Sequence, residues 1–123
     1  FSDRVLDTWG AWSLPEQPGK IAVVGAGASG SEIASAYIRY GTEVILVEML
    51  DQILPAEDKD VVRVVERTFK KQGIEVSTGS PVENVEVGDG SVKFTDKQAL
   101  FILAALWPQS RCLEPASGLF DRQ

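Results

Sequence analysis

The sequence contains no histidine and only one cysteine, Cys112. The absence of histidine excludes imidazole-based catalysis and most zinc sites. A single cysteine has no partner within the chain, so no intramolecular disulfide can form. Cys112 also has no sequence neighbour that would activate its thiol, and we expect it to have no chemical role.

Basic residues are scarce as well. The chain has 12 Lys and Arg residues against 18 Asp and Glu, and a formal net charge of −6. Without a basic cluster, nucleic acid and anionic membrane surfaces are disfavoured as partners. No apolar run approaches the roughly 20 residues of a membrane-spanning helix, and no charged-then-apolar leader precedes a cleavage site. We therefore expect a cytoplasmic protein that binds neither nucleic acid nor membranes.

The 123 residues, 44% of them hydrophobic, suffice for one domain with a buried core. We expect this domain over residues 20–105. Residues 106–123 are expected to form an irregular tail. Residues 1–19 are interpreted as a lead-in, because their glycines and prolines interrupt any sustained hydrophobic periodicity of a helix or strand. Two interpretations stay open for Trp9 and Trp12: they pack back onto the sheet, or they face a neighbouring domain or subunit.

The most informative segment is a glycine-rich turn that follows an apolar run. Residues 20–24 are expected to form a buried parallel strand, and Gly25, Gly27 and Gly30 then give a G-x-G-x-x-G pattern. The first glycine permits a sharp turn, the second removes a side chain that would block phosphates, and the third lets the next helix approach the sheet. The unpaired N–H groups and the dipole of that helix favour an anion. The pattern predicts a dinucleotide pyrophosphate site, with a turn that binds nothing as the alternative.

The residues after the turn complete a strand-helix-strand unit. Gly41 is expected to end the helix, and residues 43–47 form a second apolar strand. Glu48 follows that strand, close to the roughly 20-residue separation expected for the acid that binds an adenosine ribose. The expected helix has an apolar stripe at i, i+3, i+4, i+7 spacing, formed by Ile33, Ala36, Tyr37 and Tyr40.

A second helix and a third strand are expected next. Glu57 and Asp58 suit the first turn of a helix that runs to about Lys71, and Gly73 is expected to end it. Residues 74–78 read as a third strand, which gives the order β-α-β-α-β. The apolar stripe of this helix is expected to consist of Val61, Val62, Val65 and Phe69.

The last part of the domain predicts antiparallel strands in place of alternating strands and helices. Residues 82–87 and 91–95 flank Gly88-Asp89-Gly90, which predicts a hairpin, and residues 99–105 predict a return strand after the turn at 96–98. The whole pattern indicates an α/β, Rossmann-like domain: a parallel sheet flanked by helices, with a small antiparallel meander.

The motifs in this order resemble the NAD-binding domain of dihydrolipoamide dehydrogenases, within the flavin-dependent pyridine nucleotide–disulfide oxidoreductases. The resemblance spans roughly residues 14–105. It rests on residues 25–32, Val47-Glu48, Ile53-Leu54-Pro55, residues 71–76 and the meander. The family has a second G-x-G-x-x-G domain, for FAD, which leads into a redox-active cysteine pair. In this chain the motif leads into the proline–acidic helix and the meander, as on the NAD side.

The resemblance implies a cofactor-binding set for NAD. Glu48 would accept hydrogen bonds from the ribose hydroxyls and repel the 2′-phosphate of NADP, and Met49 and Leu50 stand where relatives that prefer NADP carry arginines. Glu32 would lie near the nicotinamide and flavin. The alternative for Glu32 is an acid in the first helical turn, stabilised by the dipole. The implied set is Gly25, Gly27, Ala28, Ser29, Gly30, Glu32 and Glu48.

Two departures from the family pattern concern the site and the end of the domain. Small Ala28 stands where an aromatic or branched residue often shields the flavin or nicotinamide. Residues 104–108 lack the glycine and arginine of the family's alanine–glycine–arginine–x–proline turn. The cysteine pair, the histidine base and FAD that dihydrolipoamide oxidation needs cannot be built from this chain. We therefore expect NAD(H) binding without turnover, no catalytic residue and no metal site, with the FAD and interface domains as missing partners.

Three alternatives remain beside this interpretation. The first is an FAD-binding domain. The second is a non-catalytic interaction module whose exposed surface drives homo-oligomerisation. The third is a self-sufficient dehydrogenase, which a tyrosine–x–x–x–lysine pair would support. Gly41 after Tyr37 and Val44 after Tyr40 disfavour it.

Overall fold

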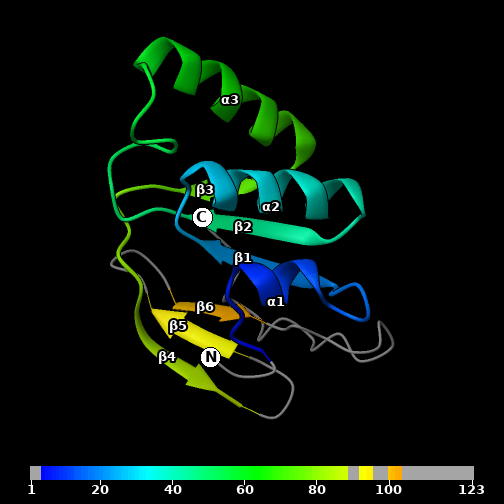
Figure 1. Cartoon of the computed structure of the whole chain (residues 1–123). Helices are drawn as coiled ribbons and strands as arrows, with labels where there is room; N and C mark the ends of the chain where they lie inside the picture. The colour runs from blue at the N-terminus through cyan, green and yellow to red at the C-terminus, as the bar shows by residue number, and fades with distance from the viewer. Residues whose placement is uncertain (1–3, 89–91, 96–99, 104–123) are drawn as a thin grey trace.

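The computed structural model of the chain describes residues 4–88, 92–95 and 100–103 (Figure 1). The elements are α1 (Thr8–Trp12), β1 (Lys20–Val24), α2 (Ala28–Arg39), β2 (Glu43–Val47), α3 (Lys59–Gln72), β3 (Glu75–Ser77), β4 (Glu83–Val87), β5 (Val92–Thr95) and β6 (Leu100–Leu103). None of the helices described there is long and apolar enough to cross a membrane.

The first three strands form a parallel sheet in the order β1-β2-β3. Ile21 lies opposite Val44, and Val24 lies opposite Val47, which places the ends of β1 and β2 side by side. Two right-handed crossovers in the same direction put both connecting helices on one face, and Figure 1 shows α2 and α3 on the same side of the sheet. This arrangement confirms the Rossmann-like fold.

The antiparallel meander is confirmed too. Strand β4 pairs with β5, which pairs with β6, and β6 lies against β1. A register irregularity interrupts β4 between Glu83 and Glu86. Residues 89–91, 96–99 and 104–123, and with them the predicted hairpin turn, part of the return strand, the tail and Cys112, lie outside the described residues.

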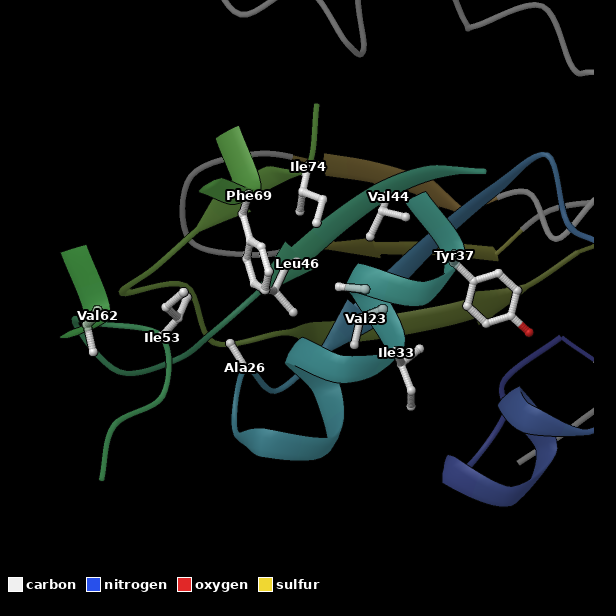
Figure 2. Close-up of a cluster of buried hydrophobic side chains, with 11 residues drawn as sticks. Val23, Ala26, Ile33, Tyr37, Val44, Leu46, Ile53, Val62, Phe69 and Ile74 are labelled. Carbon is white, nitrogen blue, oxygen red and sulfur yellow. The ribbon is translucent and has the colours of Figure 1, made fainter. Parts of the chain in front are cut away.

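The core lies between the two helices and the parallel sheet (Figure 2). Ile33, Ala34 and Tyr37 of α2 are buried. The predicted stripe was wrong at Tyr40, which is 69% exposed, because the helix ends there and Gly41 turns the chain with a φ of 90°. Ala34 takes the inward position instead. The Tyr40 ring lies edge-on against the Tyr37 ring, with centroids 6.4 Å apart.

Helix α3 ends at the predicted Gly73, but the assignment of Glu57 and Asp58 to its first turn was wrong, because the helix begins at Lys59 and Asp58 is its N-cap. The Asp58 carboxylate accepts a hydrogen bond from the Asp60 N–H at 2.8 Å, and Gly73 ends the helix with a φ of 90°. Val62 and Phe69 are buried, whereas Val61 is 50% exposed and the prediction for it was wrong. Adjacent helical residues point about 100° apart, so Val61 and Val62 cannot both face the core.

Strand β1 is less buried than predicted at its end. Val23 is buried, but Val24 is 60% exposed. Side chains alternate between the two faces of a strand, and only the face of Val23 is covered by helices. The interpretation of residues 20–24 as a strand is confirmed, and its complete burial was wrong.

The lead-in contains an element that the sequence did not predict. The Asp7 carboxylate accepts a hydrogen bond from the Gly10 N–H at 2.8 Å and caps the short helix α1. Trp9 and Trp12 are 79% and 51% exposed, so the interpretation in which they pack onto the sheet was wrong. Instead, Ala11 packs against the core, and its carbonyl accepts a hydrogen bond from the Tyr37 hydroxyl.

This hydroxyl should make stability depend on pH. Burial, with a contribution from Tyr40, raises the pKa of Tyr37 above its ordinary value of 10.0. The folded state therefore binds this proton more tightly than the unfolded state, so its contribution is complete below pH 10.0 and falls as the pH rises further. We expect the difference in unfolding free energy between wild type and Tyr37→Phe to shrink above pH 10.0 in urea titrations. Parallel curves for wild type and Tyr37→Phe would contradict this account.

Candidate functional site

Three glycines shape the turn between β1 and α2, here called the glycine turn (residues 25–30). Gly25 has a φ of 96° and donates its N–H to the Val47 carbonyl at 2.7 Å, which confirms the predicted sharp turn. A Cβ on Gly30 would lie 1.8 Å from the Gly25 carbonyl oxygen, so no side chain fits there. A Cβ on Gly27 would meet no atom within 4 Å among the described residues beyond its chain neighbours. The backbone at Gly27 therefore borders open space.

The N-terminus of α2 follows directly. Gly27 is the N-cap residue, and no side chain of the described part of the chain caps this helix. The first intrahelical bond runs from the Ser31 N–H to the Gly27 carbonyl at 3.0 Å, and Ala28 and Ser29 are exposed. The first turn contains no acid. Uncapped N–H groups and the positive end of the helix dipole therefore meet at one place, which suits an anion.

Glu48 lies at the tip of β2, beside this turn, and is 6% exposed. Its Oε2 accepts a hydrogen bond from the Ala26 N–H at 2.7 Å, and its Oε1 accepts one from the Leu50 N–H at 3.0 Å. An ionised carboxylate offers about four acceptor positions, so further donors can be accommodated. The carboxylate joins the glycine turn to the loop after β2, a structural role that the sequence did not reveal.

The remaining predicted site residues lie at the rim. Glu32 is exposed. It lies in the second turn of α2, since the helix begins at Ala28, so the interpretation as a first-turn acid was wrong. Met49 and Leu50 are 66% and 46% exposed beside Glu48.

A cleft of about 450 Å³ opens beside the glycine turn, a volume within the range of small-molecule sites. One side consists of β1, the glycine turn and α2 from its start to Tyr37. The other consists of the segment over residues 4–14, here called the N-terminal wall, which contributes Arg4, Asp7 and Thr8. The sequence analysis missed this wall, although Asp7, three residues before Gly10, is an N-cap signal. Within the described residues, no group of three or more potential ligands could hold a metal ion.

Comparison with known proteins agrees with the geometry. The model of the pyridine nucleotide-disulphide oxidoreductase family matches residues 20–97. A dihydrolipoyl dehydrogenase of Staphylococcus aureus is 38% identical over 95 residues, which is 77% of this chain and 20% of the relative. One from Bacillus subtilis is 38% identical over 96 residues, again 77% and 20%. The chain thus spans about a fifth of the length of these relatives.

Solved structures give the same fold. An HOCl-induced flavoprotein disulfide reductase from Escherichia coli superposes with a TM-score of 0.70 at 26% identity, covering 76% of this chain and 22% of that one. A water-forming NADH oxidase from Lactobacillus brevis, solved bound to NADH, superposes with a TM-score of 0.68 at 25% identity, covering 73% and 20%.

Proposed function

Because the chain belongs to the pyridine nucleotide-disulphide oxidoreductase family, whose members use a pyridine nucleotide and FAD, we propose that it is the NAD(H)-binding part of a larger dihydrolipoyl dehydrogenase-like flavoprotein. The observation that carries the proposal is the uncapped N-terminus of α2 beside a turn whose Gly27 borders open space. Bound there, NAD supplies the hydride-accepting nicotinamide. The residues of this chain bind and orient it.

The pyrophosphate is proposed to lie against the N–H groups of Ala28, Ser29 and Gly30. These groups precede the first intrahelical hydrogen bond of α2. The positive end of the helix dipole attracts the pyrophosphate there, although the net charge of the chain is −6. The open space at Gly27 gives the phosphate oxygens access to the backbone.

Glu48 is proposed to select NAD over NADP. Its carboxylate can accept hydrogen bonds from ribose hydroxyls in addition to those from the Ala26 and Leu50 N–H groups. A 2′-phosphate would meet like charge there, and the exposed Met49 and Leu50 offer it no cation. The NADH bound to the Lactobacillus brevis oxidase supports a nucleotide of this kind.

Turnover is proposed to require the rest of a longer protein. By resemblance, that part supplies FAD, a cysteine pair and a histidine base, and the complete protein is expected to be a cytoplasmic homodimer. Glu32, exposed on α2, would then face the nicotinamide and flavin. This chain by itself is expected to bind NAD(H) and to catalyse nothing.

Calorimetric titration of the chain with NADH, NADPH and FAD tests the proposal. We expect saturable binding of NADH and binding of NADPH weaker by about tenfold or more, which corresponds to about 1.4 kcal/mol. FAD bound more tightly than NADH, or yellow protein on purification, would assign the site to the flavin instead. No binding of any nucleotide would favour the non-catalytic interaction module.

A further inference from the structure

The segment before β1 forms the second side of the cleft beside the glycine turn. Arg4, Asp7 and Thr8 line this cleft together with Gly27, Ala28 and Ser29. Figure 1 shows why: α1 begins at the end of the sheet where β1 ends and α2 begins. A molecule that occupies the cleft therefore contacts the N-terminal wall as well as the N-terminus of α2.

The N-terminal wall is attached to the domain by contacts with α2 and the core. The Tyr37 hydroxyl donates a hydrogen bond to the Ala11 carbonyl, and Ala11 and Leu14 pack against the buried cluster. The Asp7 cap fixes the first turn of α1. A short helix of this kind is marginal alone and is held by such tertiary contacts. The residues just before it are thereby directed to the mouth of the glycine turn.

The N-terminal wall brings one basic and one acidic side chain to the cleft. Arg4 is the one basic residue among the described residues that line the cleft, and its side chain is half-buried. Asp7 is the one acid there, and its Oδ1 already accepts the Gly10 N–H. A guanidinium presents several N–H donors in a plane that matches two phosphate oxygens at once.

We infer that Arg4 binds the pyrophosphate of the dinucleotide from the side opposite the α2 N-terminus, so that the two walls hold the phosphates between them. The inference rests on the proposed function, because it names a second partner for the ligand of that site. In this arrangement Arg4 contacts neither the adenosine nor the nicotinamide.

The test compares Arg4→Gln with Arg39→Gln in the 123-residue chain, by calorimetric titration with NADH and with ADP-ribose. Arg39 is exposed in the last turn of α2 and is not among the residues that line the cleft. We expect Arg4→Gln to weaken both ligands by about tenfold, as for a lost charge-assisted hydrogen bond, and Arg39→Gln to leave both unchanged. Affinity should also fall less steeply with salt in Arg4→Gln than in wild type.

Two further measurements are the affinity of Arg4→Lys for NADH and the Tm of Arg4→Gln. Lysine keeps the charge without the planar donors, so Arg4→Lys should recover part of the lost affinity. Equal affinity of wild type and Arg4→Gln for NADH would overturn the role of Arg4 and leave the proposed function standing. Wild type that binds no nucleotide would overturn both. A lowered Tm for Arg4→Gln with unchanged affinity for NADH would also overturn the role of Arg4 in binding, since Arg4 would then only support the fold.

Discussion

Gly30→Val should abolish NADH binding, with a loss of at least roughly 100-fold, and destabilise the domain by about 3 kcal/mol. The added Cβ would lie 1.8 Å from the Gly25 carbonyl oxygen and 3.0 Å from its carbonyl carbon, both rigid backbone atoms. The start of α2 must then move away from the end of β1, which displaces the Ala28 and Ser29 N–H groups. Thermal unfolding and calorimetric titration measure the two effects.

Gly27→Ala is the matched control, because it separates binding from folding. Beyond its chain neighbours, the part of the chain that the structure describes has no atom within 4 Å of a Cβ there, and the φ of −70° suits any residue. We expect a loss of stability of at most about 1 kcal/mol, from the poorer N-cap, together with weaker NADH binding. If Gly27→Ala bound NADH as wild type does, the open space at this position would not be the phosphate site.

Glu48→Ala should weaken NADH binding by about 10-fold or more and lower stability by roughly 1–3 kcal/mol. Two effects combine in this variant. The ribose loses its proposed acceptor, and the Ala26 N–H, buried beside Glu48, loses its partner at 2.7 Å. The Leu50 N–H loses its partner at 3.0 Å as well. Calorimetry with NADH and NADPH and thermal unfolding give the magnitudes.

Glu48→Gln separates these two effects, because the amide keeps one acceptor oxygen and removes the negative charge. We expect the preference for NADH over NADPH to decrease in this variant. Glu43→Gln is the control at the start of the same strand: the Glu43 side chain is 72% exposed and pairs with Lys20 at 3.0 Å, so its loss should cost little. An unchanged NADH to NADPH ratio in Glu48→Gln would contradict a role in selecting the nucleotide.

The parallel half of the fold could be predicted because its signals are local. The glycine that ends α3, Gly73, and the apolar strands 20–24 and 43–47 each depend on neighbours in the sequence. Val61 shows the limit of this reasoning, since a helix with two pairs of adjacent valines does not indicate which valine of each pair faces the core. Packing against α2 and the sheet decides that, and packing is not local.

The sequence predicted the glycine turn and Glu48 as site residues, but it did not predict the hydrogen bond that joins them or the N-terminal wall. Ala26 and Glu48 are 22 residues apart, and only the pairing of β1 with β2 brings the carboxylate to the turn. Helix α1 has five residues, and contacts of Ala11 and Leu14 with the core stabilise it, so periodicity gave no signal. Arg4 could not be identified as a site residue before the position of α1 was known.

Amide chemical shifts in the ¹⁵N-labelled chain, measured during titration with NADH, test most directly whether the N-terminus of α2 binds a pyrophosphate. The account predicts that the N–H signals of Gly27, Ala28, Ser29 and Gly30 move with the same saturation curve, and that ADP-ribose moves them in the same way. Amides of the last turn of α2, such as Arg39, should stay in place. NADH binding that leaves the signals of residues 27–30 unmoved would contradict it.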